Sequence, residues 1–232
     1  MKKGKEIVIH SNRFSAYKYE LKKYDWQLLI AAISQIKPDS SPKTMFKLSK
    51  EEVLRLTKID EDNWNKVSFA TVDNLIKLTV SEKVEASSGV AYEARTVFSK
   101  IKYTDGELSF RFSPDIYDDL FALRQKFKQY SLSDAMKLST PQIAKLFVWM
   151  KNYEKMEKEV EVTIEDLMDI TGASLELRSR PNSFLPRVID KAKEDFEKHN
   201  MPLDFTYWKR KGAHGRIVSL VFSIFPPEYE DE

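Results

Sequence analysis

The alternation of hydrophobic and polar positions predicts one order of elements in the first half of the chain. Apolar residues at helical spacing come first, and the spacing then shifts towards two, which is typical of strands. The predicted elements are a helix over 24–36, a short strand at 46–48, helices over 49–57 and 63–77, strands over 78–86, 92–103 and 107–112, and a short helix over 115–123.

The same order returns in the second half. The predicted elements are a helix over 140–153, a short strand at 160–162, helices over 163–172 and 183–199, and strands over 203–208 and 217–225. The segments Ser49–Glu52 and Thr163–Asp166 both carry a helix-capping pattern, at matching places in the two halves. Helix, short strand, two helices and hairpin is the order of a winged helix, a variant of the helix-turn-helix. The sequence therefore predicts an α+β chain with two tandem winged-helix domains, over 1–123 and 124–232.

Composition narrows the class of protein. A hydrophobic content of 42% is enough for two packed cores, and the absence of cysteine excludes disulfides and thiolate metal sites. No apolar run suits a signal peptide or a membrane span, so we expect a cytoplasmic protein that does not contact membranes. The histidines His10, His199 and His214 form no metal-binding motif, and no phosphate-binding loop of the GxxxxGK[ST] type occurs. We expect no cofactor, no metal and no enzymatic activity.

Charge is unevenly distributed although the net charge is only +2. Residues 151–170 contain three lysines against seven carboxylates, and residues 176–216 contain ten cations against six carboxylates. An acidic stretch followed by a basic one allows a basic face on a nearly neutral protein, although two ordinary solvated surfaces would give the same counts.

The last predicted helix has one apolar side and one polar side. At about 100° per residue, Phe184, Val188, Ile189, Ala192 and Phe196 fall on one side. The polar side and its flanks are formed by Arg180, Ser183, Arg187, Asp190, Lys191 and Glu194. Arginine and serine near the start of a helix suit base edges in the major groove, whereas the carboxylates repel phosphates unless they pair internally. An ordinary amphipathic surface helix is the alternative.

Two further features bear on this helix. The segment Arg178–Pro181 before it predicts a basic loop, which makes Arg178 a further candidate for contacting DNA. Pro186 fits the helix only within the first turn, where an amide proton is unpaired in any case.

The last hairpin carries a cluster of cations. Lys209, Arg210, Lys211 and Arg216 surround a tip that contains Gly212. Such a wing can neutralise several phosphates or insert an arginine into the minor groove. A solvated turn is the alternative interpretation, because lysine and arginine are common in turns.

The first half is less suited to reading bases. Its third helix is rich in carboxylates, and Lys66 and Lys77 are its main cations. Its strands are long and rich in apolar residues, and long hairpins of that kind can pair between protomers. We therefore expect the first domain to form a homodimer and to make secondary phosphate contacts. A sheet buried within its own domain is the alternative.

Several segments resemble the iteron-binding plasmid replication initiator (Rep) family, over about residues 7–225. Near the start these are Val8–Asn12, Tyr24–Leu29 and Ala32–Ile36, and further along they are Phe127–Leu132, Leu138-Ser139, Leu146-Phe147 and Phe184–Glu194. Their order and spacing, more than any single segment, carry the resemblance.

The resemblance implies a role. Such proteins bind tandem repeats of double-stranded DNA at a plasmid origin, help to open it and recruit host replication factors. Many also dimerise through the first domain and repress their own promoter. By position, the resemblance assigns repeat reading to the second domain, through Arg180, Ser183, Arg187 and Lys191 together with the basic wing.

Two other functions fit the same pattern. A winged-helix transcriptional repressor uses the same DNA chemistry on a single operator. A protein-interaction adaptor uses winged helices to contact other proteins, and its binding would not weaken with salt in the way phosphate contacts do.

Overall fold

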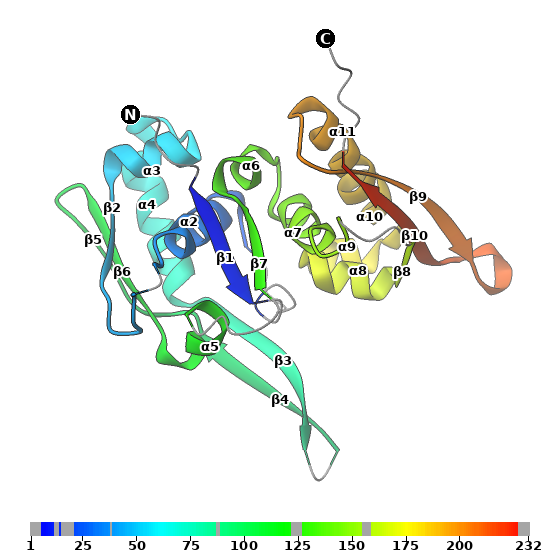
Figure 1. The fold of residues 1–232 in the computed structure, drawn as a ribbon, viewed down its shortest axis with the longest axis horizontal. Coiled ribbons are helices and arrows are strands. Elements are labelled where there is room, and N and C mark those ends of the chain that lie inside the picture. Colours follow the sequence, from blue (N-terminus) through cyan, green and yellow to red (C-terminus); the bar gives the residue numbers. More distant parts are fainter. Residues whose placement is uncertain are drawn as a thin grey trace. The chain divides into compact units, whose positions relative to one another are not determined.

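The computed structural model describes residues 6–11, 14, 21–37, 39–86, 89–121, 127–154 and 159–226. The chain divides into two compact units, Met1–Met136 and Lys137–Glu232. The predicted boundary lay after Leu123. Strand β7 (Phe127–Ser131) pairs with β1 (Ile7–Ser11), and this pairing places the residues after 123 in the first unit (Figure 1).

The first unit contains a winged helix in the predicted order. Its elements are α2 (Lys23–Ser34), β2 (Phe46–Ser49), α3 (Lys50–Thr57), α4 (Glu61–Ile76), β5 (Phe98–Thr104) and β6 (Glu107–Phe112). The three strands form an antiparallel sheet in the order β2-β6-β5. The Ser49 hydroxyl accepts a hydrogen bond from the Glu52 amide, so the predicted cap of α3 is confirmed. Stacked and edge-to-face rings of Phe46, Phe98, Phe110 and Phe112 fill the core beneath this sheet.

A separate hairpin follows α4. It consists of β3 (Thr79–Ala86) and β4 (Gly89–Thr96), which form a two-stranded sheet of their own and extend away from the helices of the unit (Figure 1). The single strand predicted over 92–103 is therefore wrong, because Val97 interrupts it. The Val97 amide donates to the Leu78 carbonyl at 3.0 Å, and its carbonyl accepts from the Ser113 amide at 2.8 Å. Val97 is fully buried, so this junction is anchored between the two sheets.

The remaining elements of the first unit surround this winged helix. They are η1 (Pro114–Ile116), α5 (Tyr117–Leu120) and α6 (Leu132–Lys137), in addition to the β1–β7 pair. Inside that pair His10 and Tyr130 are both buried, with the His10 Nε2 3.2 Å from the Tyr130 hydroxyl. The pairing joins residues 120 positions apart and was not predicted from the sequence.

The second unit repeats the topology of the first. Its elements are α7 (Pro141–Met150), β8 (Val160–Thr163), α8 (Ile164–Thr171), α9 (Leu175–Ser179), α10 (Pro181–Phe184), η2 (Leu185–Asp190), α11 (Lys191–Lys198), β9 (Asp204–Lys211), η3 (Ala213–Gly215) and β10 (Ile217–Phe225). The sheet order β8-β10-β9 matches β2-β6-β5, with the short first strand at one edge and the last strand in the centre. Thr163 caps α8 through the Asp166 amide, as Ser49 caps α3. Gly172, in the left-handed conformation with φ 65°, ends α8 as predicted.

The region before the third helix differs from the prediction. The short helix α9 includes Arg178 and Ser179, the first two residues of the predicted basic loop Arg178–Pro181. The third helix starts at Pro181 and runs without interruption through α10, η2 and α11 to Lys198. Pro186 therefore lies beyond the first turn, contrary to the condition that the sequence analysis set for it. The segment η2 that contains it is a π-helix, whose wider turn accommodates a residue that lacks an amide proton and would clash with the carbonyl four residues earlier.

Candidate nucleic-acid interface

The third helix of the second unit has the predicted two faces. The apolar residues of the inner face are buried: Phe184, Val188, Ile189, Ala192 and Phe196. On the outer face Arg187, Asp190 and Glu194 are exposed, and Ser183 and Lys191 are half-buried. The polar face is therefore available to a partner, and the predicted assignment of faces is confirmed.

Both carboxylates on this face have partners within the protein. The Tyr207 hydroxyl, on β9, donates to Asp190 Oδ1 at 2.5 Å. Burial, followed by the hydrogen bond to Asp190, raises the pKa of Tyr207 to about 12, so its hydroxyl stays protonated and remains a donor at neutral pH. Lys191 Nζ donates to Glu194 Oε2 at 2.7 Å. From the sequence, Asp190 and Glu194 were expected to repel phosphates unless they paired within the protein. Both carboxylates have such a partner.

Arg180 and Arg187 share one carboxylate. Arg187 Nη1 lies 3.2 Å from Glu176 Oε1, and Arg180 Nη1 lies 4.0 Å from the same oxygen. Both arginine side chains remain more than half exposed, at 57% and 69%. Each guanidinium can therefore still reach an external hydrogen-bond acceptor, in competition with Glu176.

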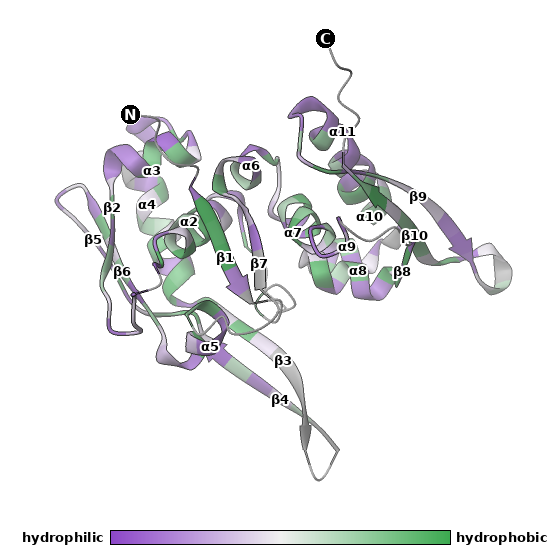
Figure 2. Cartoon of the chain, in the orientation of Figure 1, coloured by the Kyte–Doolittle hydropathy of each residue, from purple (hydrophilic) through white to green (hydrophobic). Residues whose placement is uncertain are grey.

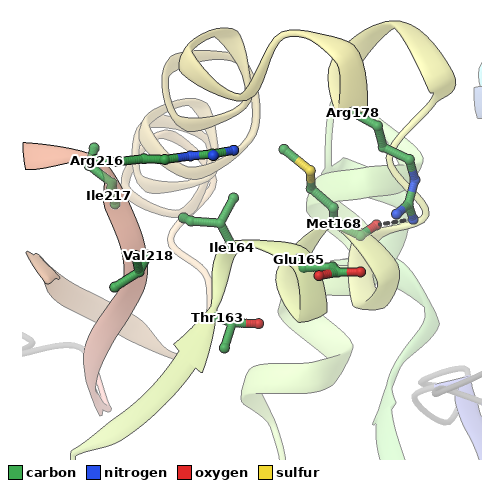
Figure 3. A pocket seen from close by; sticks show the side chains of 8 residues that line it. All are labelled: Thr163, Ile164, Glu165, Met168, Arg178, Arg216, Ile217 and Val218. Atoms are coloured by element: carbon green, nitrogen blue, oxygen red, sulfur yellow. Dashed lines mark hydrogen bonds between the residues drawn. The ribbon is translucent and has the colours of Figure 1, made fainter. Parts of the chain in front are cut away.

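Arg178 has a different environment from the other predicted cations. Its Nη2 donates to the Met168 carbonyl at 3.1 Å (Figure 3). Its Nε donates to the Ala173 carbonyl at 3.0 Å, and its Nη2 also pairs with Asp169 at 2.7 Å. These acceptors lie in and just after the last turn of α8, where the Met168 carbonyl also accepts from the Ala173 amide at 2.8 Å. Arg178 therefore fastens α9 to the end of α8.

The wing presents its cations to solvent. Lys209, Arg210, Lys211 and Arg216 are all exposed, and Figure 2 shows the end of β9 as strongly hydrophilic. Arg210 Nε lies 3.5 Å from Glu161 Oε1 on β8, and the Glu161 carboxylate also accepts from the Ser219 hydroxyl at 2.6 Å. Since the Arg210 side chain is still 62% exposed, this contact leaves it accessible.

Two glycines shape the wing tip for different reasons. A Cβ on Gly212 would lie 2.7 Å from Val218 Cγ1, so any larger side chain would require the Val218 side chain to move. Gly215 has φ 72°, a conformation that strains other residues. The tip thus folds tightly between Lys211 and Arg216, and the Gly212 amide donates to the Arg216 carbonyl at 2.8 Å.

A cleft of about 540 Å³ lies between the start of α8 and the start of β10, next to the wing tip. Thr163, Ile164, Glu165, Met168, Arg178, Arg216, Ile217 and Val218 line it. Figure 3 shows Arg216 on the wing side of the cleft and Arg178 on the side of α9. Arg216 and Glu165 bring opposite charges to this cleft, and the third charged residue that lines it, Arg178, is paired with Asp169.

The predicted residues thus fall into two groups and one exception. Arg180, Ser183, Arg187 and Lys191 lie on or directly before the third helix, and Lys209, Arg210, Lys211 and Arg216 lie on the wing. The hydrogen bond from Tyr207 to Asp190 joins the helix to the base of β9. Arg178 is the exception, because it is held by α8.

Comparison with known proteins decides the family. Residues 7–151, more than half of the chain, match the family model described as "Initiator Replication protein, WH1". The chain belongs to this initiator family. No curated protein sequence matches it.

Solved structures support the same fold for the initiator. The Pi initiator protein, crystallised in complex with iteron DNA, is 16% identical, with a TM-score of 0.75 over 98% of this chain and 100% of that one. Domains 2 and 3 of RctB are 12% identical, with a TM-score of 0.52 over 87% of this chain and 81% of that one. Because the first of these likenesses spans both units, the tandem winged-helix fold is confirmed.

Sequence reasoning missed the carboxylates that face the cations. Glu176 and Glu161 entered only as members of charged stretches, yet each contacts a predicted DNA-binding arginine. A local signal existed for one contact, since Glu176 and Arg180 are four residues apart. The contact to Arg187 had no such signal, because it depends on the angle between α9 and the third helix.

The equivalent face of the first unit has a different surface. On α4, Lys66 is exposed and Lys77 pairs with Asp73 at 2.7 Å. Phe69 lies between them along the helix with 83% of its surface exposed. At the start of α4, Glu61 accepts from Lys50 at 2.6 Å, and this hydrogen bond lowers the pKa of Glu61 and raises that of Lys50. The initiator therefore has two third helices with unlike surfaces.

Two further findings concern the described part of the chain. Within it, no three His, Cys, Asp or Glu side chains come together in an arrangement that would hold a metal ion. None of the helices described there has the length and apolar character needed to cross a membrane.

Proposed function

We propose that this initiator binds tandem repeats of double-stranded DNA at a plasmid replication origin and thereby starts replication. The observation that carries the proposal is the exposed basic wing, Lys209–Lys211 with Arg216, joined through Tyr207 and Asp190 to a third helix that exposes Arg187. A third helix and a wing are the two elements with which winged-helix proteins contact adjacent DNA grooves. Membership of the initiator family and the fold shared with an initiator crystallised on iteron DNA support it.

The second unit is the main DNA-reading part in this proposal. Arg180, Ser183, Arg187 and Lys191 face the major groove, where arginine can take two hydrogen bonds from guanine. The wing cations neutralise phosphates and supply affinity for any sequence. Arg216 contacts a phosphate beside the wing tip, and Arg178 supports the interface without contacting DNA.

The first unit supplies self-association and secondary phosphate contacts in the same proposal. The β3–β4 hairpin forms a sheet of its own, and Tyr92 on β4 is 75% exposed. An extended hairpin with an exposed aromatic residue is suited to pairing with a second copy. Under this proposal, host replication factors are further partners, and the protein also represses its own promoter. It acts in the cytoplasm, by binding alone and without catalysing a reaction.

A gel-shift titration on DNA flanking the gene tests the proposal. We expect a ladder of shifted bands that resists non-specific competitor, because each tandem repeat takes one protein. With about five phosphate contacts, log K should fall with log salt at a slope of roughly −4 to −5. A single resistant band would instead support a repressor on one operator, and the absence of any resistant band would support a protein-interaction adaptor.

A further inference from the structure

One carboxylate occupies the space where the third helix would meet DNA. Glu176 Oε1 lies 3.2 Å from Arg187 Nη1 and 4.0 Å from Arg180 Nη1, and the Glu176 side chain is 61% exposed. Elsewhere on the described interface, Glu194 contacts Lys191 and Glu161 contacts Arg210, each carboxylate with one cation. The charge of Glu176 therefore acts both on Arg187, in the third helix, and on Arg180, directly before that helix.

The fold holds Glu176 in this position. The Ser174 hydroxyl caps α9 by accepting from the Leu177 amide at 3.4 Å, and the Arg178 amide donates to the Ser174 carbonyl at 3.0 Å. The Arg178 side chain fastens the same short helix to the end of α8 through the Ala173 and Met168 carbonyls and Asp169. Arg178, which was predicted to bind DNA, thus holds Glu176 next to two other arginines, Arg187 and Arg180.

A carboxylate in this place acts on all DNA, whatever its sequence. A phosphate that approaches Arg187 or Arg180 competes with Glu176 for the guanidinium group and is repelled by the charge of Glu176. On the correct repeat, hydrogen bonds to base edges compensate for the lost ion pairs. On other DNA only phosphate contacts are available, so the unfavourable effect of Glu176 is not compensated.

We propose that Glu176 is a specificity determinant that competes with DNA phosphates for Arg187 and Arg180 and so weakens binding to sequences without the correct base contacts. It acts as a repulsive element against the wrong partner, which is a recognised route to specificity. This inference rests on the proposed DNA binding by the second unit.

The test compares Glu176→Gln with Glu197→Gln in the full-length protein. Glu197 is an exposed carboxylate near the end of α11, so the control removes the same charge outside the contact with the arginines. Affinities are measured on origin DNA and on random-sequence DNA across a range of salt concentrations. For Glu176→Gln we expect about threefold or more tighter binding to random DNA, a smaller change on origin DNA, and a salt slope on random DNA steeper by about 0.9. The control should leave the ratio of the two affinities unchanged.

A double variant shows whether Glu176 acts through its partner. In an Arg187→Ala background, Glu176→Gln should lose most of its effect on random DNA, because the competition for that guanidinium no longer exists. The inference is overturned if Glu176→Gln and Glu197→Gln increase the affinities for origin DNA and for random DNA by the same factor. It is also overturned if Glu176→Gln weakens binding to origin DNA alone, since Glu176 would then read a base itself.

Failure of the inference is distinguishable from failure of the proposed function. If the wild-type protein prefers origin DNA and Glu176→Gln keeps that preference, only the role of Glu176 is wrong. If the wild-type protein shows no preference for origin DNA, the proposed function is wrong and the role of Glu176 falls with it.

Discussion

The two winged helices of this initiator share a topology and differ in the surface of their third helix. Both have a short first strand paired with the last strand, and both cap the second helix from the final residue of that short strand, at Ser49 and at Thr163. In the first unit the third helix begins with Glu61 and Asp62 and exposes Phe69. In the second unit it begins beside Arg180 and exposes Arg187. The shared core therefore accommodates two surface chemistries, because the outer face of a helix does not take part in packing.

The wing of the second unit also carries more positive charge near its tip than the wing of the first. The first wing turns at Asp105 and Gly106, and its strand β5 carries Lys100 and Lys102. The second wing carries three consecutive cations before its tip and one after it. Because the topology is shared, the proposed assignment of DNA reading to the second unit rests on this difference in surface charge.

Neutralising the second wing should have the largest effect. We expect Lys209→Ala, Arg210→Ala and Lys211→Ala together to weaken binding to every DNA by roughly 100-fold at 0.1 M salt and to reduce the magnitude of the salt slope by about 2.7. The matched variant of the first wing, Lys100→Ala with Lys102→Ala, should have a much smaller effect. Gel-shift or fluorescence-anisotropy titrations measure both. Equal losses per cation from the two wings would contradict the division of roles between the units.

Truncating one arginine should have a smaller effect that depends on sequence. Arg187→Ala should cost about 1–3 kcal/mol of binding free energy on origin DNA and relax the preference for one base pair, because a bidentate contact to guanine is lost. Lys66→Ala, on the exposed face of α4, should weaken binding to all DNA sequences equally, and by less than Arg187→Ala weakens binding to origin DNA. Affinities on a set of singly substituted repeats measure both effects. If Lys66→Ala changed base preference and Arg187→Ala did not, the assignment of the reading helix would be reversed.

The smallest effect concerns stability and should be confined to the first unit. Asp25 on α2 is buried and accepts a hydrogen bond from Asn74 on α4 at 3.0 Å. Burial raises the pKa of Asp25 in the folded state, although the hydrogen bonds from Asn74 and Thr71 act in the opposite direction. The protonated form is thus favoured on folding, and this contribution to stability is present below the unfolded-state pKa and is lost as pH rises through the folded-state pKa.

Asp25→Asn should therefore stabilise the first unit at pH 7, with a gain that shrinks in acid as the wild-type carboxyl becomes protonated. The asparagine oxygen can still accept from Asn74, so the contact between α2 and α4 is kept. Hydrogen exchange measured on peptides from each unit checks this, with the second unit as the internal reference. Slower exchange in both units, or a gain that grows in acid, would be inconsistent with it.

Local patterns predicted much of the interface. The inner face of the third helix followed from helical spacing at positions such as Val188 and Phe196, and both are buried. The caps Ser49 and Thr163 followed from contacts within one helical turn. The wing cations followed from their position beside a glycine-containing turn. In each case the deciding interaction joins residues that are close in sequence.

Contacts between distant segments could not be predicted in this way. The break at Val97 depends on hydrogen bonds to Leu78, before the β3–β4 hairpin, and to Ser113, after the β5–β6 pair. Pro186 was restricted to a first turn from sequence rules alone, whereas the helix admits it further along by widening into a π segment.

By itself the sequence determined the repeated order of elements, the helix caps, and the faces and cations of the second winged helix, because periodicity, capping and turn chemistry act over a few neighbouring residues. Only the tertiary structure decided the pairing of β1 with β7, the role of Arg178 as a clamp between helices, and the placement of Glu176 against Arg187. Each of these depends on the angle and distance at which separate elements pack, and that geometry is set by the cores beneath them.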